Sequence, residues 1–198
     1  RGGGVRAHWS GPVHRSPPGG SPLNPPPIMV VNRFVGLLAI LTLVVTVAAV
    51  VALVTRRVPA WARDVALPVG TLIALGATLG SLYYSEVAGY PPCTLCWYQR
   101  IAIYPQVVVL GVAAWRRDRE VWRTSVPLAL IGIAFSVWHI VIEQVPSLAG
   151  PCDPSNPCTI LWVEEFGFLT IPTMALVTGA ALIASTLLAR TDPDRSPR

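Results

Sequence analysis

The stretch PPCTLCWYQR, residues 91–100, stands between two long apolar segments and contains a Cys-x-x-Cys motif. Proline is accepted at the start of a helix but cannot continue one, so Pro91 and Pro92 predict that a helix begins at the cysteines. The dipole at a helix start favours a thiolate over a thiol. Two cysteines at this spacing can cycle between a dithiol and a disulfide. The motif therefore predicts a redox site, and a static structural disulfide is the alternative.

Arg100 belongs to the same site if the stretch is helical. Cys93, Cys96 and Arg100 occupy positions i, i+3 and i+7, which share one face of a helix. A guanidinium on that face stabilises a nearby thiolate and could hold a carbonyl oxygen of a bound electron acceptor. The alternative is an arginine that only anchors the helix at the membrane surface. The shared face favours a functional Arg100.

A second cysteine pair, Cys152 and Cys158, completes the cysteine content of four. It lies in the segment PCDPSNPC, residues 151–158, which is too polar and too rich in proline to be embedded in lipid. A disulfide here closes a short ring, so it gains little loop-entropy stabilisation and is a candidate for exchange with another protein. The following residues 160–166 mix large apolar side chains with two carboxylates, which predicts either an interfacial segment or an ordinary covering loop.

Composition places the remainder of the chain in a membrane. Apolar residues make up 53% of the chain and charged residues 13%, and the mean hydropathy is +0.55. Five segments are long enough to cross a bilayer as helices; they are 34–54, 66–85, 96–115, 126–145 and 168–189. We therefore expect an all-α integral membrane protein, with a four-helix transmembrane bundle and one extra N-terminal transmembrane helix. The third segment carries Gln99, Arg100 and Pro105, so its polar start should face a protein interior or the membrane surface.

Arginine placement predicts the orientation, because basic residues gather in short cytoplasmic connections. Arginines follow the first, third and fifth segments, whereas the stretches 86–95 and 146–167 contain none. Both cysteine connections should therefore be extracytoplasmic in a multi-pass plasma-membrane protein with a cytoplasmic C-terminus. The arginines before residue 34 argue against this orientation. The net charge of +5 does not indicate a nucleic-acid partner, since no aromatic residues are interleaved with the arginines in the manner that stacks bases.

The predicted division of the chain has four parts. Residues 1–28 are expected to be a disordered Gly/Pro-rich tail, with Met29 as the hypothetical natural start. Residues 29–65 hold the extra transmembrane helix and a cytoplasmic loop. Residues 66–189 form the redox bundle, and residues 190–198 form a cytoplasmic tail. A cleaved signal peptide is the alternative for the first apolar segment, although its apolar run exceeds the usual signal core.

Several motifs together resemble the DsbB family of disulfide-forming membrane proteins, most closely its BdbC-type branch, over about residues 66–189. The motifs are Cys93 to Arg100, Trp138-His139, Glu143-Gln144, the second cysteine pair and the run Glu165 to Pro172. The resemblance implies a four-helix bundle that reoxidises a thioredoxin-like extracytoplasmic thiol oxidase. It also implies that the electrons pass to a membrane quinone, either ubiquinone or menaquinone. The first apolar segment lies outside the family's pattern.

The resemblance also assigns roles to individual residues. Cys152 resembles the cysteine that joins the partner, and Cys158 its loop mate. Cys93 looks like the residue that exchanges with the loop pair, and Cys96 like the one that reacts with quinone. Arg100 matches the family arginine beside the quinone ring. Cys96 would also lie about 4.5 Å deeper along a helix than Cys93, and so nearer to an acceptor dissolved in lipid.

Other residues near the expected site have both functional and structural interpretations. His139 stands four residues before Glu143, so both can share a face; His139 could help a reduced quinone take up protons, or it could be a hydrogen-bonded histidine within the bundle. The segment 76–80, GATLG, predicts close helix packing inside the bundle rather than a dimer contact. Four aromatic residues fit an interfacial belt; they are Tyr83, Tyr84, Trp97 and Trp138.

Two other classes of protein remain as alternatives. An enzyme resembling vitamin K epoxide reductase also joins a loop pair and a Cys-x-x-Cys motif to quinone chemistry, but there the loop pair comes first in the sequence, and here the order is reversed. A non-enzymatic membrane protein could use the four thiolates as structural disulfides or as one zinc site. We expect a redox relay without a metal.

Overall fold

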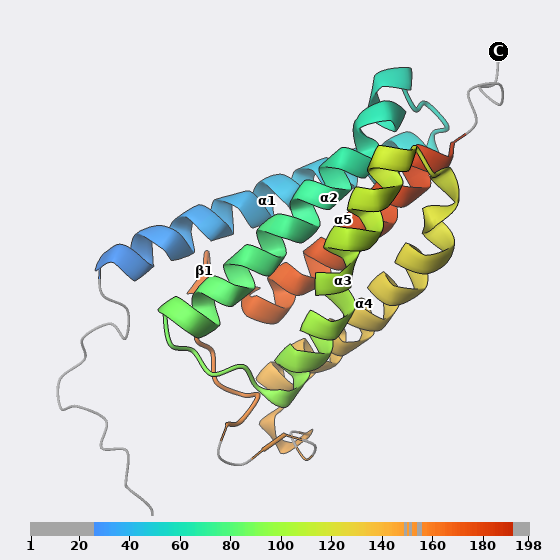
Figure 1. Cartoon of the computed structure of the whole chain (residues 1–198). Helices are drawn as coiled ribbons and strands as arrows, with labels where there is room; N and C mark the ends of the chain where they lie inside the picture. Colours follow the sequence, from blue (N-terminus) through green and yellow to red (C-terminus); the bar gives the residue numbers. More distant parts are fainter. Residues whose placement is uncertain (1–25, 149, 151, 154–155, 192–198) are drawn as a thin grey trace, which may run out of the picture.

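Five long helices dominate the computed structural model, which describes residues 26–148, 150, 152–153 and 156–191 (Figure 1). They are α1 (Pro26–Val54), α2 (Ala60–Leu82), α3 (Thr94–Arg116), α4 (Trp122–Gln144) and α5 (Ile171–Arg190). Short turns of helix cover Tyr83–Val87, Arg119–Val121 and Pro146–Leu148. Of the predicted disordered tail, residues 1–25 lie outside the described part of the chain. Residues 26–28, which the prediction also placed in the tail, belong to α1 instead.

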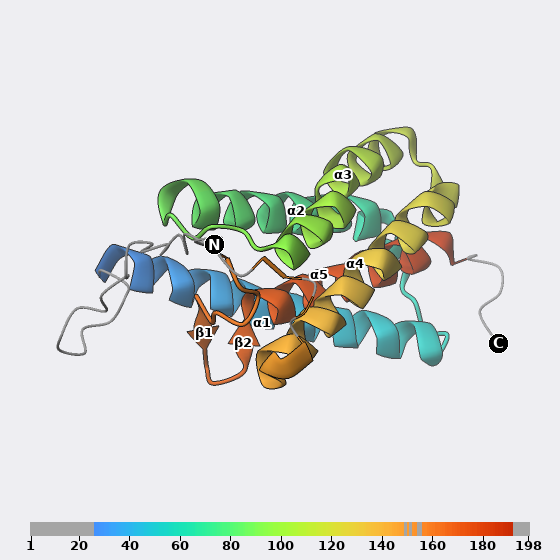
Figure 2. The same cartoon turned by 90° about the horizontal axis from the view of Figure 1, so that it is seen from below.

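The helices α2 to α5 form the predicted bundle, in which α5 packs against both α2 and α4 while α3 bridges α2 and α4. Successive helices run in opposite directions, so the cysteine segments gather at one end and the arginine-rich connections at the other (Figures 1 and 2). The extra helix α1 lies outside the bundle, along α5. This arrangement confirms the predicted fold class.

Four of the five described helices are long and apolar enough to cross a membrane, and α3 is the exception. Polar side chains inside α3 lower its hydropathy, but two of them, Gln99 and Gln106, are buried against neighbouring helices. Gln106 donates through Nε2 to the carbonyl oxygen of Ser125 on α4 at 2.8 Å. The polar start of α3 therefore faces the protein interior, as its sequence predicts.

Glycines on α2 separate a closely packed region from an open one. A Cβ atom added at Gly70 would lie 2.5 Å from Oγ of Ser185 on α5, so the Ser185 side chain packs directly against the α2 backbone there. A Cβ atom at Gly76 or Gly80 would meet nothing within 4 Å. The expectation that segment 76–80 is a close packing site is therefore wrong, because within the described residues no neighbouring atom contacts a Cβ atom added at either glycine.

A short hairpin precedes α5, where the sequence predicts helix from residue 168. Strands β1 (Glu164–Glu165) and β2 (Leu169–Thr170) pair antiparallel, and α5 begins only at Ile171. The turn has positive φ at Phe166 and Gly167, which a helix cannot contain. Pro172 is then accommodated in the first turn of α5.

The aromatic belt is a partly wrong prediction, because Tyr84 is buried. Its ring stacks on Tyr90 with centroids 5.9 Å apart, and Tyr90 stacks on Trp162 at 5.0 Å. Trp97 and Trp138 remain exposed on the surface, as an interfacial position requires. The buried stack ties the end of α2 to the segment that follows the second cysteine pair.

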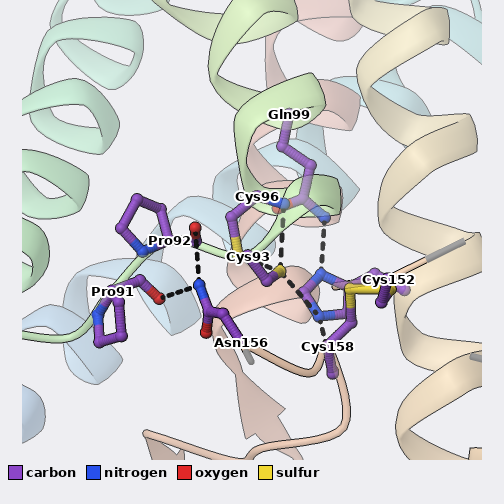
Figure 3. Close-up of a disulfide and its surroundings, with 9 residues drawn as sticks. Pro91, Pro92, Cys93, Cys96, Gln99, Cys152, Asn156 and Cys158 are labelled. Atoms are coloured by element: carbon purple, nitrogen blue, oxygen red, sulfur yellow. Dashed lines mark hydrogen bonds between the residues drawn. A yellow bond between two sulfur atoms is a disulfide. The ribbon is translucent and has the colours of Figure 1, made fainter. Parts of the chain in front are cut away.

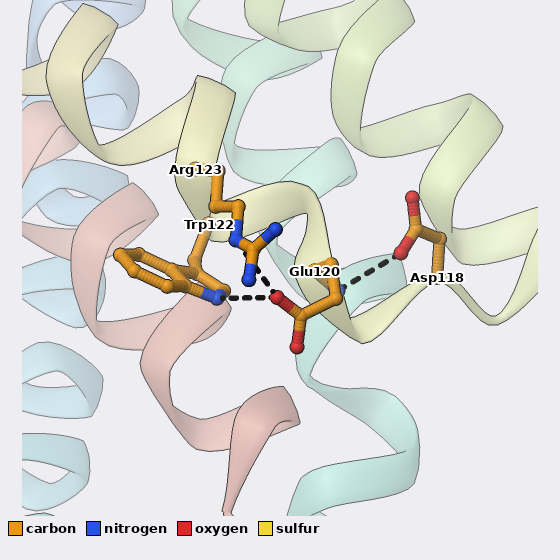
Figure 4. A network of polar contacts seen from close by, with 4 residues as sticks. All are labelled: Asp118, Glu120, Trp122 and Arg123. Carbon is orange, nitrogen blue, oxygen red and sulfur yellow. Dashed lines mark hydrogen bonds and ion pairs between the residues drawn. The ribbon is translucent and has the colours of Figure 1, made fainter.

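The opposite end of the bundle is closed by polar contacts in the α3–α4 turn (Figure 4). Asp118 Oδ1 accepts the Glu120 backbone N–H at 2.8 Å, and Glu120 pairs with Arg123 at 3.0 Å. The Arg190 guanidinium lies 4.2 Å from the centre of the Trp122 ring, which links the end of α5 to the start of α4. These contacts keep the arginine-rich end compact.

Candidate redox site

Cys93 and Cys96 lie at the start of α3, as the flanking prolines predict. Cys93 is the residue that caps the helix, and its Sγ accepts the Cys96 backbone N–H at 3.3 Å. The two sulfurs are 2.8 Å apart and both cysteines are free thiols. Cys93 is buried and Cys96 is partly buried. The two sulfurs are therefore close enough to pair as a disulfide.

The second pair forms a disulfide, Cys152–Cys158, and lies directly against the first (Figure 3). Cys158 is only 1% exposed, and it packs in one cluster with Cys93, Leu95 and Ile142. Cys152 is more accessible than Cys158. The loop disulfide therefore has a fully buried sulfur, Cys158, in the Cys93 cluster and a partly buried one, Cys152, packed against that cluster.

Asn156 fastens the loop to the start of α3. Its Nδ2 donates to the carbonyl oxygens of Pro91 at 3.4 Å and Pro92 at 3.0 Å (Figure 3). Neither proline has a backbone N–H, but both keep a carbonyl oxygen that can accept. The residues before the Cys-x-x-Cys motif thus hold the loop that carries the other pair.

His139 of α4 lies between the two pairs. Its Nε2 is 3.0 Å from the carbonyl oxygen of Cys158 and 3.8 Å from Cys93 Sγ, while its Nδ1 is 3.4 Å from Nε2 of Gln99. A carbonyl oxygen can only accept, so the Nε2 atom carries a proton, and Nδ1 accepts from the Gln99 amide. His139 therefore offers an N–H group to the Cys93 sulfur.

The surroundings of Cys93 stabilise its thiolate. The hydrogen bond from the Cys96 thiol is the largest cause that lowers the pKa of Cys93, which falls from 9.0 to about 4. The contact with His139 and the Cys96 backbone N–H act in the same direction, and burial opposes them. A low pKa makes Cys93 a good leaving group in thiol–disulfide exchange.

A cavity of about 560 Å³ lies beside Cys96, among α1, α2, α3 and α5. Its lining is mostly aliphatic, but Cys96, Gln99 and Arg100 contribute polar atoms from α3. Arg100 donates to the side chain and to the carbonyl oxygen of Ser81, each at 3.1 Å. Cys96 also lines the small pocket that holds Cys93, Cys158 and His139. Cys96 thus lines both the small pocket beside the loop disulfide and the large cavity.

Two tyrosine hydroxyls on this cavity lack partners within the described part of the chain. The hydroxyl groups of Tyr84 and Tyr104 are buried and make no hydrogen bond there. Neither hydroxyl has accessible surface, so neither is open to a ligand in the cavity. The Arg100 guanidinium lies 5.9 Å from the centre of the Tyr104 ring, on the same wall. The cavity combines an apolar body with a few hydrogen-bond donors, which suits an apolar ligand that carries carbonyl oxygens.

The structure brings together five of the six predicted site residues around the Cys-x-x-Cys motif, and it places Arg100 on the large cavity next to Cys96. His139 does not line the large cavity; it contacts Cys93 and Cys158 instead. Sequence reasoning missed Asn156 and Tyr104, since neither stands in a recognisable pattern. Gln99 did carry a signal, because it is an uncharged polar residue inside an apolar segment.

Three of the described side chains could hold a metal ion in the reduced protein. The ligand atoms of Cys93, Cys96 and His139 all lie within 4.8 Å of one another. Two thiolates and one imidazole are the donor set of many zinc sites. The same three groups are the ones that a thiol–disulfide relay needs, so the geometry alone fits both uses.

Comparison with known proteins separates these uses. The family model described as disulfide bond formation protein DsbB matches residues 63–189. Disulfide bond formation protein C of Bacillus subtilis (strain 168) is 42% identical over 123 residues, which are 61% of this chain and 89% of that protein. A probable disulfide formation protein C 1 of Bacillus anthracis is 48% identical over 103 residues, or 51% of this chain and 74% of that protein. A probable disulfide formation protein of Coxiella burnetii (strain Dugway 5J108-111) is 44% identical over 120 residues, or 59% of this chain and 80% of that protein. No solved structure matches the chain.

Proposed function

The chain belongs to the DsbB family of disulfide bond formation proteins, and from that premise we propose that it is a protein-dithiol:quinone oxidoreductase. Membership and the apolar helices make it a multi-pass membrane protein with an oxidoreductase role in disulfide bond formation. In our proposal it reoxidises a thioredoxin-like extracytoplasmic thiol oxidase and passes the electrons to a membrane quinone. The position of Cys96 carries the proposal, because this residue lines both the small pocket beside the Cys152–Cys158 disulfide and the large cavity.

The relay begins at the loop disulfide. A thiolate of the reduced partner attacks the more accessible Cys152, and the second partner thiol then releases the partner as a disulfide. Cys152 and Cys158 are left as a dithiol that holds the two electrons. The burial of Cys158 against Cys93 supports the next transfer between these two sulfurs.

In the second transfer, the Cys158 thiolate attacks Cys93 of an oxidised Cys93–Cys96 pair, and Cys96 leaves as a thiolate. Cys152 then attacks Cys158, which re-forms the loop disulfide and releases Cys93 as a thiolate. The low pKa of Cys93 and the N–H of His139 stabilise this leaving group. His139 also holds the loop pair in place, since its nearest acceptor is the Cys158 carbonyl oxygen.

The large cavity fits a quinone as the final acceptor. Arg100 supplies donors for carbonyl oxygens, and the remaining walls are largely apolar. A quinone accepts two electrons and two protons when Cys93 and Cys96 return to the disulfide. Arg100 lines the same cavity as Cys96 and would hold a carbonyl oxygen of the quinone. Ubiquinone and menaquinone both fit this description.

The partner must reach the cysteine end of the bundle from outside the cell. Arginine-rich connections occupy the opposite end, which by the positive-inside rule is the cytoplasmic one. The extracytoplasmic compartment also maintains disulfides, which the relay requires. We therefore place both cysteine segments outside and the C-terminus in the cytoplasm.

The proposal is tested by following oxidation of a reduced thioredoxin-like dithiol protein by the purified full chain, with and without added quinone. We expect quinone-dependent turnover in the wild type and its loss in both Cys96→Ser and Cys152→Ser. An exposed polar substitution, Gln144→Ala, serves as the control and should keep full turnover. Turnover that persists in either cysteine variant would contradict the relay.

Metal content distinguishes the relay from a zinc site. Protein purified without oxygen should contain far less than one zinc per chain and should turn over after reduction. One equivalent of tightly held zinc that is lost in His139→Ala, together with no turnover in the folded wild type, would assign the cysteines to metal binding.

A further inference from the structure

The N-terminal helix α1 forms one wall of the cavity although it precedes the family-matched region, which begins at residue 63. We propose that α1 and α2 together form a side opening of the cavity toward the lipid, and that α1 selects the acceptor by its hydrophobic tail. The inference rests on the proposed quinone chemistry of this cavity. It assigns a function to the one element that the family pattern leaves unexplained.

Helix α1 is held against the bundle at both ends. Near its start, Arg33 pairs with Glu165 of the hairpin at 3.8 Å. One turn further, a Cβ atom at Gly36 would lie 3.2 Å from the Phe166 ring, so the α1 backbone itself touches the hairpin. Near its end, Ala49 and Leu53 pack against the main core cluster. The wall that α1 provides is therefore part of the folded structure.

Between these anchored ends, α1 stays close to α5, and its approach to α2 is sparser (Figure 2). The facing part of α2 carries Gly76 and Gly80, where no atom lies within 4 Å of an added Cβ. Both glycines line the cavity. The missing side chains on α2 leave the space that α1 borders but does not fill.

Exposure identifies the opening of the cavity. Three leucines line the cavity yet remain largely exposed: Leu38 at 45%, Leu41 at 58% and Leu72 at 65%. A residue that both lines a cavity and faces the surroundings lies at its rim. Leu38 and Leu41 belong to α1 and Leu72 to α2, so the rim lies between these two helices. In a membrane this rim faces lipid.

The chemistry of the α1 wall suits a hydrocarbon tail rather than a quinone ring. Its lining residues are Val35, Leu38, Ala39, Leu41 and Thr42. The Thr42 hydroxyl donates to the Leu38 carbonyl oxygen at 2.8 Å, so it has no need of a ligand. The polar atoms that suit a ring come from α3, which Figure 2 shows away from α1. The wall extends for roughly 10 Å from Val35 to Thr42, at 1.5 Å per residue.

Selection here depends on shape. A tail that is already dissolved in lipid gains little from apolar burial alone, because lipid is as apolar as leucine. Close van der Waals contact with the α1 wall is what distinguishes one tail from another. A bulky side chain on this wall should therefore reduce binding of a tailed acceptor and leave a ring-only acceptor nearly unaffected.

The test compares quinone kinetics of the full chain with a decyl-tailed benzoquinone and with the same ring lacking the tail. Leu38→Trp and Ala39→Trp should raise KM for the tailed quinone at least about tenfold, because overpacking displaces the tail. KM for the ring-only quinone should change less than about twofold. Leu37→Trp is the matched control; Leu37 is 57% exposed and does not line the cavity, so neither KM should change. Equal KM values in the Leu38, Ala39 and Leu37 variants would overturn the inference.

A binding measurement keeps the inference testable if a tryptophan variant fails to fold. Wild-type protein is irradiated with a quinone that carries a photoreactive group on its tail, and the labelled peptides are identified by mass spectrometry. We expect label between residues 34 and 56, and label confined to α3 and α5 would contradict it. Label on α1 without any quinone-dependent turnover would support the tail site while contradicting the proposed oxidoreductase function.

Discussion

The reactive sulfur of Cys93 depends on its neighbours more than on its position at a helix start. The Cys96 thiol, the Cys96 backbone N–H and His139 all surround it, and each favours the thiolate. The sequence motif predicts that the helix start stabilises the Cys93 thiolate. The contact between Cys93 and His139, 46 residues away, exists only in the folded chain. Groups from two helices thus favour the Cys93 thiolate, which the proposed relay uses as a leaving group.

In the reduced protein, the Cys93 thiolate should persist far below the ordinary pKa of a thiol. Its folded pKa is lowered to about 4, so the stability that the thiolate contributes is full above pH 9 and is lost as the pH falls toward 4. Ultraviolet thiolate absorbance, measured against Cys93→Ser, should titrate with a midpoint well below 9. In Cys96→Ala the midpoint should rise, since the largest cause is removed. A midpoint near 9 in the otherwise unchanged reduced protein would disprove this account.

Asn156 should control the transfer between the two cysteine pairs. Its amide joins the loop to the carbonyl oxygens of Pro91 and Pro92. Asn156→Ala should slow reduction of the Cys93–Cys96 pair by a partner dithiol about tenfold, since each lost hydrogen bond contributes about 0.5–1.5 kcal/mol. The rate is measured by rapid alkylation and mass spectrometry, with Gln144→Ala as the control. An unchanged rate in Asn156→Ala would show that the loop is held by other contacts.

At the scale of the elements, α2 combines a packed half and an open half. Gly70 leaves room for the Ser185 side chain of α5 against the α2 backbone, whereas Gly76 and Gly80 border the cavity. A glycine pattern alone does not distinguish these situations, because small residues serve close packing as well as open space. Only the positions of α1 and α5 decide which glycine lies in a closely packed contact and which borders the cavity.

Two alanine substitutions on α2 should therefore have opposite effects. Gly70→Ala should lower the thermal unfolding temperature in detergent, because the new Cβ would lie 2.5 Å from the Ser185 hydroxyl. Gly76→Ala should stabilise the protein by up to about 1 kcal/mol, since alanine is the better helix former and meets no neighbour. If the unfolding temperature shifts in the same direction in both variants, this account of α2 is contradicted.

At the scale of the whole molecule, the alternating helices separate the two kinds of connection. The cysteine pairs lie at one end and the arginine-rich turns at the other (Figure 1). The α3–α4 turn at the arginine end contains the polar contacts among Asp118, Glu120 and Arg123. This separation is what a relay between an external partner and a membrane acceptor requires.

Labelling of intact cells should reveal this orientation. In a version with all four cysteines replaced by serine, a membrane-impermeant maleimide should label Ser147→Cys at the cysteine end. Asp118→Cys at the arginine end should react only after the membrane is permeabilised, and loss of an acidic residue has little effect on orientation. The reverse pattern would place the cysteine pairs in the cytoplasm and contradict the proposed partner.

The sequence by itself determined the helices, the redox motif at the start of α3 and the family, because apolar length, proline placement and cysteine spacing are local properties. It could not show that Tyr84 is buried, that His139 contacts Cys93 or that Gly76 faces open space. These depend on which distant segments pack together, and a single chain's periodicity does not specify that. Only the tertiary structure decided that Cys96 lines two pockets and that α1, outside the family pattern, forms one wall of the larger one.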